Sequence, residues 1–261
     1  MPSLADHHSA NFVKLMYIGD SGTGKTGSLD SLLADGYRLY ILDLDNGLDA
    51  LIAHVKETCP DKLDNIDFIT LRDKMKSDPV RGPVVAGTPR AYTNAIKALD
   101  KWDDGSTPSE WGADTIFVLD SLTLFGRAAM NWAQGMNPSA KDPRQWYGAS
   151  QESILRVLDL LTGADFRANV IVISHVDYVE MPDETMRGFA SSIGKALGPK
   201  IPAVFNTMIL AETRGSGENV KRTITTMPTA TIDLKNPKSS TLPKSLPLAT
   251  GMATIFQALK G

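Results

Sequence analysis

The segment Gly19-Asp20-Ser21-Gly22-Thr23-Gly24-Lys25-Thr26 constrains the fold of this chain more than any other part of its sequence. It fits the pattern G-x-x-x-x-G-K-[ST] and lies between a predicted strand at residues 12–18 and a predicted helix at 25–35. In this pattern, called a P-loop, glycines let backbone N–H groups surround phosphate oxygens, and the helix N-terminus attracts their charge. We therefore expect residues from Gly19 to Gly27 to bind a nucleotide, with Lys25 at the β- and γ-phosphates and Thr26 on Mg²⁺.

The rest of the chain alternates apolar runs with helical patterns. Nearly continuous apolar runs, as expected of strands buried on both faces, occur at residues 38–44, 115–119 and 169–174. Helical patterns at residues 122–133 and 149–161 separate the later runs. This order predicts an α/β fold with a mostly parallel central sheet flanked by helices.

The C-terminal part is predicted to add an antiparallel edge to the sheet. Residues 204–211 and 220–226 have the pattern of a hairpin around Gly215-Ser216-Gly217, and residues 230–234 are expected to add a strand. We expect one domain over residues 1–261, with a flexible segment at 1–11 and a tail helix at 247–261.

One connection and the helix that follows it complete the predicted organisation. Residues 72–87 are expected to form a polar connection, because they carry several Pro, Gly and charged residues. In the helix that follows, Thr88 is placed as the N-cap and Pro89 in the first turn.

Composition excludes several classes of protein. The 261 residues are 42% hydrophobic and 22% charged, which suits a large globular core and excludes collagen, coiled coils and wholesale disorder. No apolar run approaches the ~20 residues of a membrane span, and the first residues lack a signal-peptide pattern. The single cysteine, Cys59, allows no internal disulfide. We therefore expect a cytoplasmic protein with no membrane partner.

Charge is distributed unevenly along the chain. The net charge is −3, yet the residues from Thr185 to the end include ten Lys and Arg against three Asp and Glu. Such asymmetry can mark a face that binds a polyanion, and chance variation of surface charge is the alternative. The charge pattern alone leaves this choice open.

Carboxylates follow two of the predicted strands. One strand ends in Asp120, where a P-loop needs an acid that holds Mg²⁺ through water; capping of the next helix is the alternative role. Another strand ends in Asp43 and Asp45, and either acid could orient or deprotonate an attacking water. Since Asp-Asn-Gly is also a favourable strand-end turn, the residues alone leave these alternatives open.

A histidine follows the apolar run that ends at Ser174. Here His175 can contact the terminal phosphate and transmit its loss to the next loop, and a hydrogen-bonded histidine at a strand end is the alternative. The other histidines are His7, His8 and His54, whose spacing does not suit a metal site. The only metal we expect is therefore Mg²⁺ bound together with ATP.

The ordered set of motifs resembles the RecA-like recombinase ATPases. The P-loop is followed by Asp43-x-Asp45, Asp120-Ser121, Ser174-His175 and Lys235-Asn236-x-Lys238. The segments at 45–48 and 194–199 are similar to those of compact phage-encoded RecA-like proteins that support single-strand annealing. The resemblance spans about residues 14–246 and implies a RecA-like P-loop NTPase fold.

This resemblance implies roles for four residues. Asp45 corresponds to the catalytic carboxylate, where bacterial recombinases carry Glu, and His175 corresponds to a polar γ-phosphate sensor. Lys235 and Lys238 correspond to lysines that reach a neighbouring subunit's ATP and stabilise charge on the transferred phosphoryl group. Without the resemblance, these two would be solvated lysines.

The resemblance also implies a DNA-binding surface. Loops at residues 134–146 and 179–202 correspond to loops with which family members bind single-stranded DNA. Cations can contact the phosphates and an aromatic ring can stack on a base, whereas ordinary surface loops are the alternative. The implied DNA-binding residues are Lys141, Arg144, Arg187, Phe189, Lys195 and Lys200.

The function implied is that of an ATPase that binds single-stranded DNA during phage recombination, repair or replication. Its expected partners are DNA, further copies of the chain with ATP at their boundaries, and a phage single-strand-binding protein. One alternative is a helicase-like or loader motor on the same core. Another is a nucleotide-binding interaction module with little hydrolysis.

Overall fold

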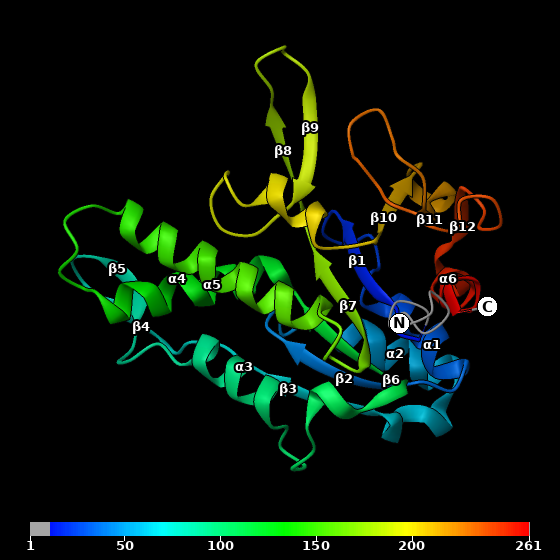
Figure 1. Ribbon diagram of the computed structural model, residues 1–261, viewed down its shortest axis with the longest axis horizontal. Coiled ribbons are helices and arrows are strands. Elements are labelled where there is room, and N and C mark those ends of the chain that lie inside the picture. The colour runs from blue at the N-terminus through cyan, green and yellow to red at the C-terminus, as the bar shows by residue number, and fades with distance from the viewer. Residues whose placement is uncertain (1–10, 261) are drawn as a thin grey trace, which may run out of the picture.

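The computed structural model describes residues 11–260, and within them eight strands form one sheet (Figure 1). The strands are β1 (Lys14–Gly19), β2 (Arg38–Asp43), β3 (Ile66–Thr70), β6 (Gly112–Asp120), β7 (Ala168–Ser174), β10 (Thr207–Arg214), β11 (Lys221–Thr225) and β12 (Ser245–Pro247). Their order is β12-β11-β10-β1-β7-β6-β2-β3. From β10 to β3 every neighbouring pair is parallel, and β11 and β12 pair antiparallel at one edge. The predicted α/β fold with an antiparallel C-terminal edge is confirmed.

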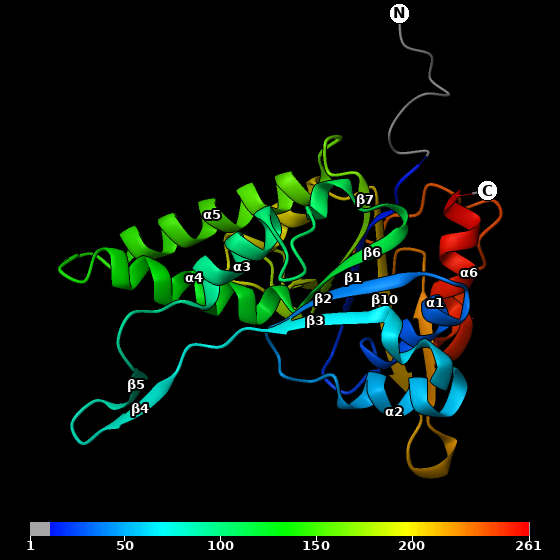
Figure 2. The ribbon, with the colours of Figure 1, turned by 90° about the horizontal axis from the view of Figure 1, so that it is seen from below.

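Helices cover both faces of this sheet, because the central strands are apolar on both sides. The helices are α1 (Asp30–Ala34), α2 (Asp49–Thr58), α3 (Ala91–Asp100), α4 (Leu122–Met136), α5 (Arg144–Thr162) and α6 (Leu248–Lys260). On β1, Met16 belongs to the apolar cluster with α3, α4 and α5, whereas Leu15 belongs to the cluster with α1, α2 and α6 (Figure 2). The two-residue alternation of a strand therefore supplies both cores.

Among the described residues, no helix combines the length and the apolar character that crossing a membrane requires.

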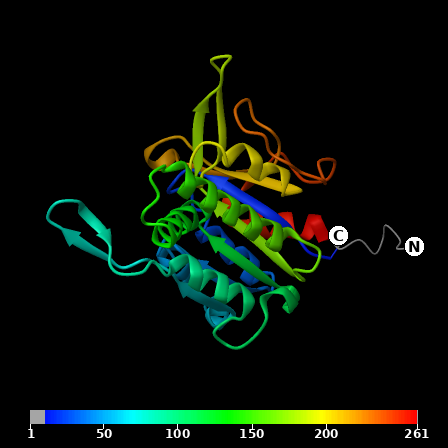
Figure 3. The same ribbon diagram turned by 60° about the vertical axis from the view of Figure 1, so that its left-hand side comes forward.

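Two β-hairpins extend from this body (Figures 1 and 3). One pairs β4 (Met75–Asp78) with β5 (Gly82–Val85), and the other pairs β8 (Val176–Glu180) with β9 (Met186–Ala190). The first lies where we predicted a polar connection, and the second includes much of the predicted loop at 179–202. Both predictions missed the hairpins, since these short strands lack the apolar alternation of a half-buried strand.

The predicted helix boundaries are wrong at two places. Thr88 does not cap α3; instead Oδ1 of Asp73 accepts hydrogen bonds from the N–H groups of Arg90 (2.7 Å) and Ala91 (2.9 Å). The loop predicted at 134–146 is shorter, because α4 continues to Met136 and α5 already begins at Arg144. The cap on α3 comes from 17 residues upstream, and no local motif indicates it.

The C-terminal region agrees with the prediction except at residues 230–234. These form no strand, and only Lys235 makes an isolated antiparallel bridge, to Met208. The antiparallel edge consists of β11 and β12, and α6 occupies the predicted tail helix at 247–261. Of the segment predicted to be flexible at 1–11, residues 1–10 lie outside the described part of the chain.

Candidate nucleotide-binding site

The carboxyl ends of β1, β2, β6 and β7 border one cavity of about 190 Å³. Neighbouring parallel strands point the same way, so the residues that follow them gather at one edge of the sheet, where α/β proteins bind ligands. The residues lining the cavity are Ser21, Gly22, Gly24, Lys25, Thr26, Gly27, Asp45, Gly47, Ala50, Asp120, Ile173 and His175. The structure thus brings the P-loop, two of the predicted carboxylates and the predicted histidine together.

The P-loop needs glycine at position 24 for two reasons. Gly24 has a φ of +90°, in the left-handed region that favours glycine. A Cβ added to Gly24 would also lie 2.6 Å from Cδ2 of Leu248, at the start of α6. The pattern G-x-x-x-x-G-K-[ST] therefore serves packing against the C-terminal helix as well as phosphate binding.

Lys25 is a buried cation at this cavity, with 6% of its surface exposed. Its Nζ donates to the carbonyl oxygens of Gly19 (2.7 Å) and Asp20 (2.9 Å), and it forms no ion pair with residues 11–260. Burial lowers the pKa of Lys25, and the nearby carboxylate of Asp120 opposes this shift. A cation held only by neutral oxygens can exchange them for the oxygens of an anionic phosphate.

Thr26 and Asp120 are joined across the cavity. Oγ1 of Thr26 donates to Oδ2 of Asp120 at 2.6 Å, and only 3% of Asp120 is exposed. Ser121, not Asp120, caps α4, because its side chain accepts from the N–H of Leu124. A hydroxyl and a carboxylate in contact are the two protein ligands that Mg²⁺ uses in P-loop sites.

This donor set suits a magnesium ion shared with a nucleotide. No three His, Cys, Asp or Glu side chains gather into a metal site anywhere in residues 11–260. A metal at Thr26 and Asp120 would therefore have two protein ligands and would need phosphate or water oxygens for the rest, which is the usual preference of Mg²⁺.

Burial raises the pKa of Asp120 to about 7, and the carboxylates of Asp45 and Asp43 contribute, while the hydrogen bond from Thr26 opposes the shift. The folded chain thus holds a proton that the unfolded chain releases near pH 3.8, and the free energy of unfolding falls as pH rises between these values.

We expect Asp120→Asn to stabilise the metal-free protein at pH 8 by about 1–4 kcal/mol, and hardly at pH 4. Urea unfolding in EDTA at both pH values measures this.

Asp183→Asn is the matched control for this prediction. Asp183 is exposed, and hydrogen bonds from Thr185 lower its pKa, so its substitution should not stabilise the protein at pH 8. Equal unfolding free energies for Asp120→Asn and the unsubstituted protein at pH 8 would contradict the raised pKa of Asp120.

The two acids at the end of β2, Asp43 and Asp45, have different surroundings. Asp43 is 2% exposed; its carboxylate accepts from Oγ1 of Thr70 (2.9 Å) and from the N–H of Gly47 (3.3 Å). Asp45 lines the cavity, and its Oδ1 accepts from Oγ of Ser121 at 2.7 Å. Asp43 therefore shapes the turn, in which Asn46 has a φ of 54°, and Asp45 faces the cavity.

His175 connects the cavity with the β8–β9 hairpin. Its N–H donates to Oγ1 of Thr123 (3.1 Å), and its carbonyl accepts from the N–H of Ser191, the residue after β9 (2.8 Å). Burial lowers the pKa of His175 and Lys25 adds to this, while the carboxylates of Asp45 and Asp177 oppose it; the net shift favours the neutral ring. A neutral ring can donate one hydrogen bond and accept another at the cavity.

Two of the six predicted DNA-binding residues are engaged within the chain. Arg144 pairs with Asp142 (2.7 Å), and Arg187 pairs with Asp233. Phe189 is half-buried. The DNA-binding role of Arg144 and Arg187 stays a prediction, and in the structure each of the two guanidinium groups is paired with an acid.

The other three predicted cations are exposed and form no ion pair with residues 11–260. They are Lys141, Lys195 and Lys200. The segment that follows β9 contacts the N-terminal half of α5, where Nε2 of Gln151 donates to the carbonyl of Ile193 at 3.0 Å. The segment after β9 therefore adjoins the first half of α5, the helix that follows the other predicted loop region.

Lys235 and Lys238 do not lie on the predicted edge strand. Nζ of Lys235 donates to the carbonyls of Pro202 and Phe205 of its own chain (3.1 Å for the latter), which it holds together. The side chain of Lys238 is partly exposed and makes no hydrogen bond with the described residues. Of the two, Lys238 is the cation available to a neighbouring molecule.

Three residues at the site were not predicted. Ser121 donates a hydrogen bond to Asp45. Leu248, which is 9% exposed, and Arg222 lie against the P-loop at Gly24. The Asp-Ser pair after β6 was a usable signal for Ser121. No local signal marks Leu248 or Arg222, since each lies some 200 residues from Gly24 in the sequence.

A known protein family matches most of this chain. The model of a family described as an AAA domain matches residues 11–237. No curated protein matches the chain. Among solved structures, the chain is similar to a KaiC-like protein from the hyperthermophilic archaeon Pyrococcus horikoshii OT3. The two are 12% identical, the match covers 88% of this chain and 87% of that chain, and the TM-score is 0.43.

Proposed function

This chain belongs to the AAA domain family of P-loop ATPases, and from that premise we propose that it hydrolyses MgATP and couples the nucleotide state to binding of single-stranded DNA. Such an activity would serve recombination, repair or replication of DNA, as in phage RecA-like proteins. One observation carries the proposal: Lys25, the bonded pair Thr26–Asp120, and Asp45 all line one cavity.

Lys25 and the P-loop bind the phosphates of ATP. In exchanging the Gly19 and Asp20 carbonyls for phosphate oxygens, the ammonium of Lys25 keeps two hydrogen bonds and gains opposite charge. Thr26 and Asp120 would hold Mg²⁺, which neutralises charge on the phosphates. Because the pKa of Asp120 is raised to about 7, a proton competes with the metal below this pH. Metal binding is therefore favoured above pH 7, where the carboxylate is charged.

Asp45 orients the attacking water and accepts its proton. Its Oδ1 is held by Ser121, which leaves Oδ2 for a water molecule in the cavity. A carboxylate so fixed can act as a general base in hydrolysis. Because Asp is one methylene shorter than Glu, slow turnover is expected.

His175 transmits the nucleotide state to the DNA-binding side. It lines the cavity, and its backbone is hydrogen-bonded to Thr123 and Ser191. A shift of His175 on phosphate release would therefore move the base of the β8–β9 hairpin and the segment after it. That segment includes Lys195 and adjoins α5 through Ile193 and Gln151.

The DNA surface proposed here is smaller than the sequence implied. It consists of Lys141, Lys195 and Lys200, whose charges are unpaired within residues 11–260, together with the half-buried Phe189 and with Tyr147, which is 42% exposed. Exposed cations next to aromatic rings suit single strands, since phosphates and bases are bound together. A phage single-strand-binding protein remains a proposed partner on the same DNA.

The chain is proposed to act as an oligomer with ATP at subunit boundaries. The support is Lys238, whose ammonium makes no bond to the described residues and so can approach a neighbour's nucleotide. Lys235 instead contributes by holding Pro202 and Phe205 in place, which fixes the segment between the DNA surface and β10.

The ATPase rate with and without single-stranded DNA tests this function. We expect Mg²⁺-dependent hydrolysis that single-stranded DNA accelerates and duplex DNA does not. A DNA-independent rate would favour the nucleotide-binding module, and ATP-driven strand separation would favour the motor.

Lys195→Ala is expected to reduce the salt dependence of DNA binding. Each phosphate contact releases a counterion, so the slope of log affinity against log salt should flatten by about 0.7. Fluorescence anisotropy of labelled oligonucleotides between low and moderate salt measures the slope. Lys97→Ala, an exposed lysine on α3, is the matched control and should leave it unchanged. An unchanged slope for Lys195→Ala and for Lys200→Ala would contradict the proposed surface.

A further inference from the structure

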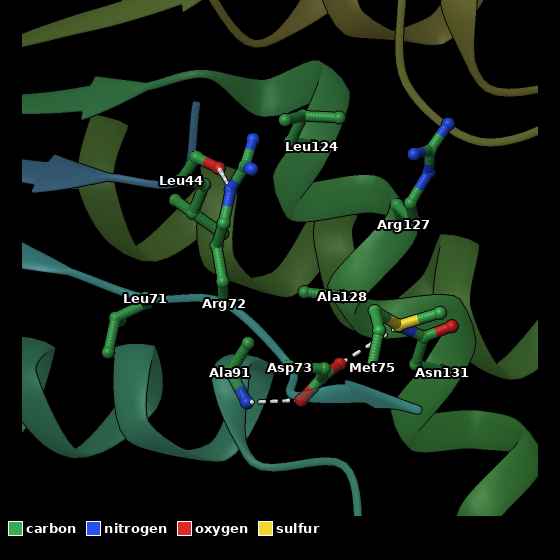
Figure 4. A pocket seen from close by; sticks show the side chains of 10 residues that line it. All are labelled: Leu44, Leu71, Arg72, Asp73, Met75, Ala91, Leu124, Arg127, Ala128 and Asn131. Atoms are coloured by element: carbon green, nitrogen blue, oxygen red, sulfur yellow. Dashed lines mark hydrogen bonds between the residues drawn. The ribbon is translucent and has the colours of Figure 1, made fainter. Parts of the chain in front are cut away.

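Arg72 is the second residue after β3 and lies beside the point where β2 ends (Figure 4). The last backbone hydrogen bond between these two segments runs from the N–H of Leu71 to the carbonyl of Asp43, at 2.9 Å. Beyond it, Nε of Arg72 donates to the carbonyl of Leu44 (3.1 Å) and Nη2 donates to the carbonyl of Asp45 (2.9 Å). The guanidinium thus continues the pairing of the two strands where the backbone no longer does.

The segment that carries Asp45 is held from its other side by β6 and Ser121. The N–H of Leu44 donates to the carbonyl of Asp120 at 2.6 Å, and Ser121 donates to Oδ1 of Asp45. These bonds constrain one edge of the segment and one carboxylate oxygen. Arg72 provides the bonds to the opposite edge, at the carbonyls of Leu44 and Asp45.

Next to Arg72 there is space into which this segment could move. A cavity of about 270 Å³ lies beneath it, lined largely by apolar side chains that include Leu44, Leu71, Met75 and Leu124 (Figure 4). These apolar side chains offer no hydrogen bond to a displaced carbonyl; of the polar groups that also line the cavity, Asn131 already donates to Asp73 (2.9 Å), and Arg127 makes no hydrogen bond to residues 44 and 45. Since only the guanidinium spans both carbonyls on this side, its removal leaves the segment free to shift toward the cavity.

We propose that Arg72 is a positioning residue for Asp45, a role that rests on the proposed catalytic function of Asp45. The planar fork of arginine presents two N–H groups in fixed geometry, which matches the two successive carbonyls. A lysine at this position could reach one of them with a single point charge. Within residues 11–260 Arg72 makes no hydrogen bond to the P-loop, so it should influence turnover without changing ATP affinity.

The test compares Arg72→Gln and Arg72→Lys with Arg127→Gln as the matched control. Arg127 lines the same cavity and is exposed, but makes no hydrogen bond to residues 44 and 45. We expect kcat to fall about 10–100-fold in Arg72→Gln, since misplacing a catalytic group by 1 Å can cost that much. KM should stay within about twofold, the Lys variant should be intermediate, and the control should be unchanged.

A second comparison separates positioning from general stability. In single-turnover hydrolysis of radiolabelled ATP, adding Arg72→Gln to Asp45→Asn should lower the rate no further, because the group that Arg72 positions is already lost. A multiplicative loss in the double variant would overturn the proposal. So would an Arg72→Gln rate equal to that of Arg127→Gln, or a parallel loss of ATP affinity and unfolding midpoint in both Arg72 variants.

Failure of the proposed function has a different signature. It would appear as no hydrolysis by the unsubstituted protein, or as full activity of Asp45→Asn, and either result would also remove the basis for positioning by Arg72. If only the inference about Arg72 fails, the unsubstituted protein hydrolyses ATP and Asp45→Asn lowers the rate, but Arg72→Gln does not.

Discussion

Asp45→Asn is expected to lower kcat by about 10²–10⁴-fold while ATP affinity changes little, because a general base acts only in the transition state. Asn keeps the size of the side chain and can still accept from Ser121, so the segment should retain its position. The loss is confined to the oxygen that would take a proton from water. Steady-state hydrolysis, together with equilibrium binding of a fluorescent ATP analogue, measures the two effects separately.

Two companion variants make this prediction specific. Asp43→Asn should mainly destabilise the fold, since its buried carboxylate holds Thr70 and the N–H of Gly47. Asp45→Glu should restore activity, or exceed it if the shorter side chain limits the rate. If Asp43→Asn lost turnover at unchanged stability and Asp45→Asn did not, the catalytic carboxylate would be Asp43.

Lys25→Ala is expected to abolish hydrolysis and weaken ATP binding by about 10–100-fold, which corresponds to the loss of one or two charged hydrogen bonds. The ammonium is the buried cation of the cavity, and no other Lys or Arg side chain lines it. Its removal leaves phosphate charge without a partner in a region of low dielectric. Isothermal titration with ATP and Mg²⁺, beside a sensitive hydrolysis assay, measures both losses.

Mixing this variant with Lys238→Ala tests the subunit boundary. Each variant alone should be inactive, yet a mixed assembly contains boundaries that pair an intact P-loop with an intact Lys238. Activity should therefore partly return on mixing. No recovery in assemblies shown to contain both variants would contradict a role of Lys238 in trans, and full activity of Lys238→Ala alone would exclude it from hydrolysis.

The sequence by itself determined the fold class and the phosphate-binding loop. Both depend on local patterns: a continuous apolar run identifies a buried strand, and the glycines of the P-loop are required by the backbone conformation at their own positions. Because the carboxyl ends of parallel strands meet at one edge, the positions of Asp120 and His175 after strands also placed them at the cavity.

The tertiary structure alone decided which residues bind which partners. Asp43 and Asp45 are two residues apart and equivalent as a pattern, and only the contacts with Thr70 and Ser121 distinguish them. Similarly, only the structure shows that Arg187, a predicted DNA-binding residue, lies opposite Asp233 where the hairpin folds against the C-terminal segment. Thr70, Ser121 and Asp233 each lie at least 27 positions from the residue that they bind.

The same holds for the contacts that shape the site from outside. Leu248 packs against the P-loop at Gly24, and Arg72 bonds to the segment that carries Asp45. The ammonium of Lys235 donates hydrogen bonds to the carbonyls of Pro202 and Phe205. Each contact joins residues between 27 and more than 200 positions apart. Hydrogen bonds and packing act over a few ångströms in space, and a local pattern cannot indicate which distant residue the fold will bring within that range.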